Sequence, residues 1–522
     1  MKLLELYKDK IIGAISGLDR IRFRGTIRWL ANEIGINKFL GVQGILLKEF
    51  TDWAKGITAA IRADCEKQAQ KYGLEMRYLN SSGVDKEALA RQIALERGIT
   101  EGPICYFSAL ESCYAPKIKG NKAKKELELK IVSSKCVHLY QYFIHPKYGW
   151  GHVRLQTWAP YNVFICLNGR HWLERQLRKQ GLAYCKDENC FPWIEDLSKA
   201  QKWLDQQLQT DWSRALGGLA KQMCPNLSRI LPLRPEYYWS ADETEWATDI
   251  LFRSRGELDA LYPALLYQAM RISDSPSVMK YMGRRCLSRS DQIKGRLPQE
   301  VMSDLRKWYE GIRVKHWLNQ NSVKMYNKSG NILRIETTIN QTRDFKVFRH
   351  PDDDPHREAG WQQMRKGVSD LHRRCEVSQK CNERYADALA AAQVEEKLKE
   401  VVAPACNPIQ KSGKKYRGLN PWQEEDYQLL TFLAKGEQAI RGFRNKELRE
   451  WLYPEAKRLP PEPQRKYAGR TTRRIKLLRV HGLVKKVANE NRYLLTAKGQ
   501  TFVQSLKTAS NVDIKTLTEM AA

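Results

Sequence analysis

The side chains best suited to chemistry in this sequence are two groups of carboxylates. The first lies in the segment 237–252, where Asp242, Glu245 and Asp249 are separated by three and four residues. In a helix this spacing places all three on one face. Enzymes that cut or join DNA use such carboxylates to hold metal ions about 4 Å apart. The spacing therefore predicts a metal-binding helix face, with Asp242 and Glu245 as catalytic residues and Asp249 as a metal ligand.

A structural interpretation of the same segment stays open. Ser240 and Glu243 have the spacing of a capping box, and acids in a first helical turn stabilise the helix dipole. Trp246 and Ile250 would then face the protein core.

The second group of carboxylates belongs to a predicted hairpin over residues 322–340, with its turn at residues 329–331. Polar and apolar residues alternate after this turn, which places Glu336 on the polar face of the second strand. Glu336 is a candidate catalytic residue, and Asp344, just beyond the strand, is a candidate metal ligand. The alternative is an ordinary solvent-facing strand stabilised by cross-strand Lys–Glu pairs.

The hairpin resembles a strand pair in replication initiators of phages and plasmids, where Tyr-Asp-Lys is followed by Leu-Arg-Ile-Glu. The matching residues are Tyr326-Asn327-Lys328 and 333–336, within fewer than twenty residues in all. The resemblance implies a role in processing DNA strands. Those initiators also carry a His-hydrophobe-His metal motif, and this sequence has no such triplet.

A strongly basic segment lies near the end of the sequence. Residues 464–486 contain nine Lys or Arg and no acid. Ile475, Leu478 and Leu483 form an apolar face, and the cations occupy the opposite one. Because a DNA duplex exposes one phosphate charge per ~1.7 Å of its axis, a helix of this kind suits a DNA groove. Two short strands around an Asn-Glu-Asn turn and a final helix are predicted to follow.

This region resembles the winged-helix domain of MarR-like regulators over about residues 420–507. The recognition helix of that family ends in a Gly-Leu-Val segment, here 481–484, and its wing closes with a Leu-Thr-x-Lys-Gly segment, here 495–499. Helices are expected upstream at 424–437 and 444–454, with Asn445 as an N-cap. The resemblance implies a winged helix-turn-helix fold and DNA binding. The insert at 458–469 is longer than usual for the family.

The predicted DNA contacts are cationic and hydroxyl side chains of the recognition helix and the wing. They are Arg470, Thr471, Thr472, Arg473, Arg474, Lys476, Arg479, Lys485, Lys486 and Arg492. Arg20, Arg22 and Arg24 alternate along a predicted strand and are expected to contact phosphates, with Asp19 as a local anchor. The alternative for these cations is solvated charge.

The composition favours a polyanionic partner. Lys and Arg number 89 against 59 Asp and Glu, a net charge of +30, which implies a strong positive field. The sequence contains no run of about 18 apolar residues and begins with no signal peptide, so we expect a cytoplasmic protein without a membrane partner. The twelve Cys are expected to be reduced thiols. No Walker A, HExxH, GxSxG or GxGxxG motif supports an NTPase, zincin, hydrolase or dinucleotide-binding function.

The predicted fold class is a mixed α/β multidomain body with a C-terminal winged helix-turn-helix domain. Residues 1–130 form an α/β domain, and residues 131–402 a mixed α/β domain with the hairpin, a largely helical part at 236–310 and a long helix from 361. A Pro/Gly/Lys-rich linker at 403–419 precedes the winged helix at 420–510.

These features predict a DNA-binding protein of a mobile genetic element or plasmid. Its catalytic form is a transposase-like or replication-initiator-like factor, a nuclease or strand transferase that depends on Mg²⁺ or Mn²⁺. A non-catalytic winged-helix transcriptional regulator and an RNA-binding protein are the alternatives. The sequence leaves the oligomeric state open.

Overall fold

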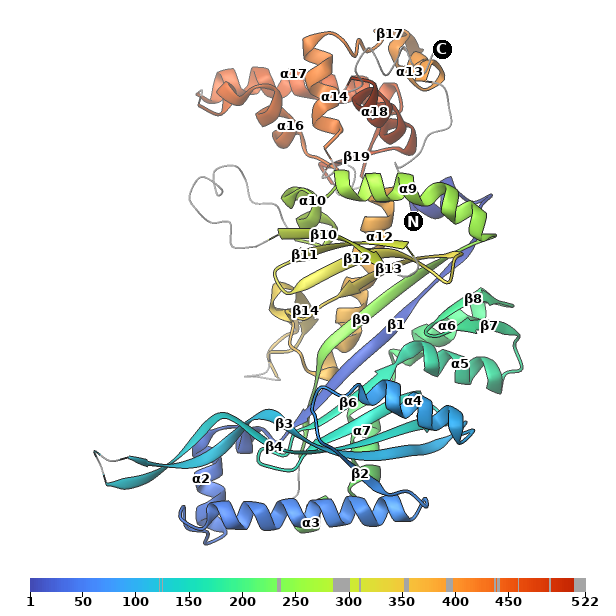
Figure 1. The fold of residues 1–522 in the computed structure, drawn as a ribbon. Coiled ribbons are helices and arrows are strands. Elements are labelled where there is room, and N and C mark those ends of the chain that lie inside the picture. Colours follow the sequence, from blue (N-terminus) through green and yellow to red (C-terminus); the bar gives the residue numbers. More distant parts are fainter. Residues whose placement is uncertain are drawn as a thin grey trace. The chain divides into compact units, whose positions relative to one another are not determined.

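A computed structural model describes residues 1–510 of the 522-residue chain, apart from internal gaps. The gaps are residues 122, 124, 232–235, 285–300, 309–310, 352–355, 391–397, 436–437, 439–441, 459 and 488–489. Helices and strands mix along the described chain, in agreement with the predicted α/β class (Figure 1). Within the described part of the chain, no helix has both the length and the apolar composition needed to cross a bilayer.

The chain folds into two compact units, and neither is continuous in sequence. The central unit comprises Ala14–Asp249 and Thr338–Ser378. The terminal unit comprises Met1–Gly13, Ile250–Thr337 and Gln379–Ala522. Two strands, β1 (Ile11–Thr26) and β9 (Tyr238–Phe252), therefore contribute residues to both units.

The central unit contains a mixed sheet with the strand order β9-β1-β6-β5-β4-β3-β2. Its remaining strands are β2 (Met76–Leu79), β3 (Gly102–Asn121), β4 (Glu126–His145), β5 (Gly149–Gln156) and β6 (Val163–Asn168). β2 pairs in parallel with β3, whereas β3, β4, β5, β6 and β1 pair antiparallel. β3 and β4 extend as one long hairpin, paired from Gly102↔Ile144 to Asn121↔Glu126.

Helices pack on both faces of this sheet. Ala90 and Ala94 of α4 (Lys86–Glu96) pack with Phe107 of β3, whereas Ala69 of α3 (Phe50–Gln70) packs with the adjacent Tyr106. Adjacent strand residues point to opposite faces, so β3 is covered on both sides. The other helices of the unit are α2 (Glu33–Val42), α5 (Gly169–Lys179), α6 (Leu197–Gln207), α7 (Trp212–Met223) and α8 (Leu227–Ile230).

Short ribbons and turns complete the central unit. β7 (Tyr184–Asp187) pairs with β8 (Cys190–Ile194), and β14 (Lys346–Arg349) pairs with β15 (Gly360–Gln363). The 3₁₀ turns are η1 (Arg28–Ala31), η2 (Thr342–Asp344) and η3 (Val368–Asp370).

The terminal unit contains an antiparallel run of four strands that includes the predicted hairpin. They are β10 (Val301–Trp308), β11 (Gly311–Leu318), β12 (Asn321–Lys328) and β13 (Ile332–Thr338), in that order in the sheet. The turn between β12 and β13 is confirmed, with positive φ at Ser329 (52°) and Gly330 (78°). Two consecutive left-handed residues match the twist of a tight hairpin. The unit also contains α1 (Lys2–Leu6), α9 (Arg255–Arg271), α10 (Ser275–Tyr281) and most of α12 (Leu371–Leu389).

Residues 424–510 of the terminal unit have the element order helix, helix, helix, strand, strand, helix. These are α14 (Glu424–Leu433), α16 (Asn445–Leu452), α17 (Pro461–Val480), β18 (Val484–Lys486), β19 (Tyr493–Leu495) and α18 (Ala497–Ser510), with the turn η4 (Pro454–Arg458) before α17. The N-cap of α16 is Arg444 rather than Asn445, and the predicted insert at 458–469 largely belongs to α17. The Asn-Glu-Asn turn begins at residue 489, which lies outside the described residues.

Three predicted elements differ from the structure. The carboxylate-bearing helix predicted within 237–252 is the strand β9, and the long helix from 361 is divided into β15, η3 and α12. The segment expected to be a linker at 403–419 contains the end of α13 (Leu398–Cys406) and the paired strands β16 (Ile409–Lys411) and β17 (Lys414–Tyr416). Ala405 and Leu419 are buried in the same apolar core as α14 and α17, so this segment is part of the fold.

Candidate functional site

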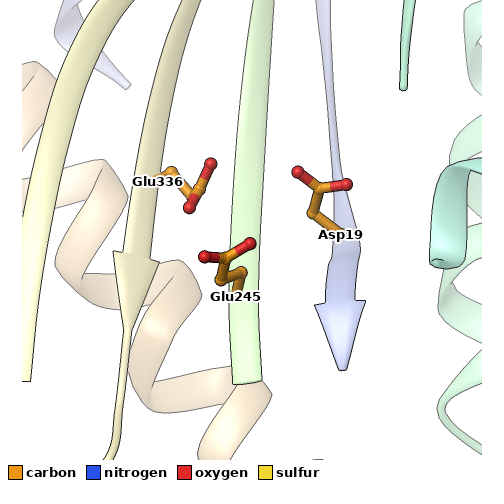
Figure 2. A group of neighbouring side chains, drawn as sticks. All are labelled: Asp19, Glu245 and Glu336. Atoms are coloured by element: carbon orange, nitrogen blue, oxygen red, sulfur yellow. The ribbon is translucent and has the colours of Figure 1, made fainter. Parts of the chain in front are cut away.

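Three buried carboxylates from three strands form the strongest candidate for a metal site. Asp19 lies on β1, Glu245 on β9 and Glu336 on β13, which are consecutive strands in the sheet order. One ligand oxygen of each lies within 4.8 Å of the other two, and Figure 2 shows the carboxylates facing one another. Their residues are 2%, 8% and 0% exposed, respectively. Among the described residues, no other group of three potential ligands meets this spacing.

Each of these carboxylates has at least one partner, which is a cation, a hydroxyl group or an amide group. Arg20 Nη2 donates to Glu245 at 2.8 Å, and Lys324 Nζ lies 2.6 Å from Glu336. The Tyr326 hydroxyl donates to the second oxygen of Glu336 at 3.0 Å. Because burying a charge without a partner is costly, these contacts allow the acids to stay inside the sheet.

Asp19 is held by amide groups. Asn168 donates to it at 2.7 Å, and Asn189 donates to its two oxygens at 2.9 and 2.8 Å. Asn168 also caps α5 by accepting from the Arg170 backbone N–H. The start of α5 therefore fixes the position of this carboxylate.

The electrostatics of Arg20 reflect its acidic neighbours. Burial acts to lower the pKa of Arg20, but the Glu245 and Glu243 carboxylates more than offset this, so its pKa is raised. Arg20 thus remains a fixed positive charge beside the cluster. Carboxylate oxygens are the ligands that Mg²⁺ and Mn²⁺ prefer, so these three acids could hold such an ion if Arg20 and Lys324 turned away.

The structure places the predicted carboxylates of residues 237–252 in three different environments. Only Glu245 joins the cluster, because the segment is a strand rather than a helix. Asp242 instead pairs with Arg24 at 3.0 Å. Asp249 pairs with Arg170 at 3.0 Å, and both side chains are completely buried. The predicted capping box is also wrong, since the Ser240 hydroxyl donates to the Arg24 carbonyl and to Asp242.

The second predicted group is also divided. Glu336 lies in the cluster, beside the Lys324 and Tyr326 side chains of the neighbouring hairpin strand. All residues of β13 are buried, so the solvent-facing strand of the alternative interpretation is wrong, whereas its cross-strand Lys–Glu pair is present between Lys324 and Glu336. Asp344 lies in η2, beyond the end of β13, and is not part of the cluster.

Asp19 was expected only as an anchor for its neighbouring arginines, and its place in the cluster was missed. A single acid in a basic strand has no spacing signal of its own. Its partners Glu245 and Glu336 are more than 200 residues away in sequence, so only the strand order brings them together.

The arginines of β1 face acids of β9. Arg20 and Arg22 both contact Glu243, at 3.1 and 3.2 Å, and Arg24 contacts Asp242. Their side chains are 41% to 56% exposed, so each guanidinium also meets solvent. A phosphate at this strand would therefore compete with ion pairs.

The predicted DNA contacts of α17 divide into an exposed and an internal set. The predicted contacts that are exposed are Arg470, Thr472, Arg473, Lys476, Arg479, Lys485 and Lys486. Thr471 is completely buried and its hydroxyl donates to the Tyr467 carbonyl, so it is not available to a groove. Arg474 forms ion pairs with Glu425 and Asp426 of α14, which assigns it an internal role. Arg492 is partly buried and pairs with Glu490 at 3.2 Å.

The two sequence segments that carry the MarR-like resemblance contact each other. The Thr496 hydroxyl donates to the Gly482 carbonyl at 2.6 Å and accepts from the Gly499 backbone N–H at 3.0 Å. Gly482 has a φ of +75°, which suits glycine at a helix end. A Cβ on Gly499 would lie 1.9 Å from the Leu483 carbonyl oxygen, so only glycine fits at this position.

Comparisons with models of protein families, with curated proteins and with solved structures gave no match.

Proposed function

We propose that this chain is a DNA-binding protein of a mobile genetic element or plasmid, which binds duplex DNA through residues 424–510. The observation that carries the proposal is the exposed row of cations on α17, continued by Lys485 and Lys486 on β18. The element order of this region is also the one expected of a winged helix, which supports a role for α17 in the major groove.

The internal contacts of α17 support this orientation. Ile475 and Leu478 are buried in the core with Leu429 of α14, so the opposite side of the helix faces away from that core. Arg474, at the edge of the apolar side, is fixed by acids of α14. The exposed arginines are free of these contacts with α14 and can bind phosphates and base edges. Clusters of such cations provide much of the affinity for DNA.

The salt dependence of duplex binding tests the proposal. Replacement of Arg470, Arg473 and Arg479 by Gln removes three charges, and we expect the slope of log K against log salt to fall by about 2.7. The matched control replaces the exposed Lys38, Lys48 and Lys179 of the central unit by Gln. If both triple variants bind labelled duplex as the parent does, α17 is not the DNA-binding helix.

The catalytic form of the proposal is metal-dependent processing of a DNA strand at Asp19, Glu245 and Glu336. A divalent ion held there would polarise a phosphodiester and activate a water molecule. The test is a denaturing gel of single- and double-stranded DNA from both flanks of the protein's own gene, with Mg²⁺ or Mn²⁺. Metal-dependent nicks should disappear in Glu336→Gln and in Asp19→Asn but persist in Asp344→Asn, since Asp344 lies outside the cluster.

A non-catalytic transcriptional regulator is the second candidate. It is favoured by the contacts of Arg20 and Lys324, which neutralise buried acids in the manner of a structural ion-pair network. This candidate predicts duplex binding without cleavage under any metal. An RNA-binding role would instead appear as stronger competition by structured RNA than by duplex DNA.

A further inference from the structure

A cationic pocket opens in the central unit, and none of the three clustered carboxylates lines it. It has a volume of about 620 Å³ and is lined by the end of β14, by β15 and by the segments on either side of this ribbon. Four cations line it, namely Arg343, Arg349, Arg365 and Lys366, and none of the described residues that line it is an acid. Gln362 and Gln363 add amide donors and acceptors to the same walls.

The cations of this pocket are positioned by neighbouring groups. Arg349 lies 3.5 Å from Asp370, and Asp370 also accepts from the Arg365 backbone N–H at 2.8 Å. The Gln363 amide donates to the Arg343 carbonyl at 3.2 Å. At the pocket wall, the Arg28 guanidinium stacks over the Tyr238 ring at 3.4 Å. These contacts hold the segments that carry the four cations around a concave surface, with Asp370 offsetting part of the charge of Arg349, and such a cationic surface suits phosphate groups.

Two exposed aromatic rings stand on the same ribbon. Phe348 and Trp361 are direct cross-strand partners on β14 and β15, and each is 58% exposed. Their ring centroids are 5.6 Å apart, and the Arg373 guanidinium lies 5.5 Å from the Trp361 ring. Large aromatic side chains that stay exposed on a short ribbon contribute little to folding stability. Their exposure is explained if a binding partner stacks on them.

We propose that the β14–β15 ribbon is a binding site for unpaired DNA, in which bases stack on Phe348 and Trp361 while the pocket cations hold phosphates elsewhere along the same strand. Stacking on aromatic rings combined with a positive groove is how single strands are bound without sequence preference. Duplex DNA fits this site poorly, because its bases are already stacked on one another. The choice of DNA over RNA rests on the proposed function. The sequence between the two strands also carries aspartates at 352–354, which the variants below leave unchanged.

The test measures binding of the full-length chain to a fluorescein-labelled 20-nucleotide thymidine strand by anisotropy over a range of KCl concentrations. Phe348→Ala/Trp361→Ala should weaken binding at least about fivefold, since each stacked base contributes substantially. Arg343→Gln/Arg365→Gln/Lys366→Gln should lower the salt slope by about 2, from about 0.7 per phosphate contact on a single strand. Both variants should bind a 20-base-pair duplex as the parent does.

Matched controls separate this site from general charge and general aromatic exposure. Tyr72→Ala removes an aromatic ring that is 53% exposed on another surface, and Lys38→Gln/Lys48→Gln/Lys179→Gln removes three exposed charges. If either site variant binds the thymidine strand no more weakly than its control, the proposal is overturned. Tighter binding to a uridine strand of equal length overturns the assignment to DNA. If α17 does not bind duplex DNA, only the duplex measurement changes and the measurement with the thymidine strand does not. The proposal for α17 and the proposal for the ribbon can therefore fail separately.

Discussion

Charged side chains inside the central unit are neutralised by partners on neighbouring elements. Arg170 and Asp249 are the extreme case, because neither side chain has any exposure and their charged atoms lie 3.0 Å apart. Arg170 Nη2 also donates to the Ala247 carbonyl. Such a pair contributes little as a whole, but removal of one partner leaves a charge buried without compensation.

This asymmetry predicts that Asp249→Ala lowers the free energy of unfolding by about 3–5 kcal/mol. Urea denaturation followed by circular dichroism measures the change. Arg22→Ala serves as the control, because Arg22 pairs with Glu243 through a side chain that is 56% exposed, and such surface pairs contribute less than about 1 kcal/mol. Equal losses in the two variants would contradict the role of burial.

The carboxylate cluster makes a separate prediction about divalent ions. A ligand that binds only the folded state at 100 times its Kd stabilises that state by about 2.7 kcal/mol. We therefore expect MgCl₂ or MnCl₂ to raise the melting temperature of the parent chain and to have a smaller effect on Glu336→Gln. Glu243→Gln is the matched control, since Glu243 contacts Arg20 and Arg22 but lies outside the cluster. A metal-induced rise that is the same in all three proteins would remove the cluster as the binding site.

The residues of this cluster were only partly predictable from the sequence. Glu245 was predicted because its segment is rich in acids, and Glu336 because its segment has the pattern of a hairpin. Asp19 had no such signal, and Asp242 and Asp249 were wrongly grouped with Glu245 because their helical spacing ignores the sheet. Which acid meets which depends on the order of β13, β9 and β1, and that order is set by contacts between distant segments.

At the level of elements, β9 shows why a helical pattern can be overridden. Its segment has acids at helical spacing and a Ser-x-x-Glu signal, which are features of local sequence alone. In the structure its acids meet Arg20, Arg24 and Arg170, which are supplied by β1 and α5. Tertiary partners of this kind outweigh the small free-energy differences of local propensity.

Residues 424–510 were predicted better, because their signals are local. The three helices have apolar residues at helical spacing, and β18 and β19 pair antiparallel. Gly482 marks the end of α17 by its left-handed backbone. The start of α17 was less predictable, since most of the residues expected as an insert at 458–469 belong to this helix.

Two glycines of this region give opposite predictions. Gly499→Ala should destabilise the region by about 1–3 kcal/mol, because the new Cβ would collide with the Leu483 carbonyl at 1.9 Å. Gly469→Ala should stabilise it by about 0.5–1 kcal/mol, because Gly469 lies inside α17 and a Cβ there meets nothing within 4 Å. Thermal unfolding together with the rate of proteolysis near residue 499 measures both changes. A neutral Gly499→Ala would mean that β18 and α18 are not packed as described.

At the level of the whole molecule, buried histidines in both units couple stability to pH. Burial lowers the pKa of His138 to about 4, and nearby Arg154 acts in the same direction. Burial also lowers the pKa of His316 to about 4, and this ring contacts the Ser303 and Tyr385 hydroxyls. The unfolded chain protonates its histidines near pH 6.5.

Between about pH 6.5 and 4, these two histidines are therefore protonated in the unfolded state and neutral in the folded state. Stability from these two residues is complete above about pH 6.5 and is lost as the pH falls toward 4, by up to about 3 kcal/mol for each histidine. Urea titrations between pH 7.5 and 4.5 should show this decline, and His316→Gln should reduce its slope. His372→Gln, at an exposed position, should leave the slope unchanged. A flat profile in the parent chain would contradict the burial of these rings.

The assembly of the terminal unit from three chain segments has a consequence for its synthesis. The Lys2 backbone N–H donates to Asp387 at 2.6 Å, and the Lys2 ammonium donates to Gln500 at 3.2 Å. A ribosome that adds about 5–20 residues per second translates the roughly 500 residues between these partners in about half a minute or longer. During that interval residues 1–13 have left the exit tunnel without their native neighbours. The beginning of the chain is thus exposed to chaperones and proteases until almost all of the rest has been made.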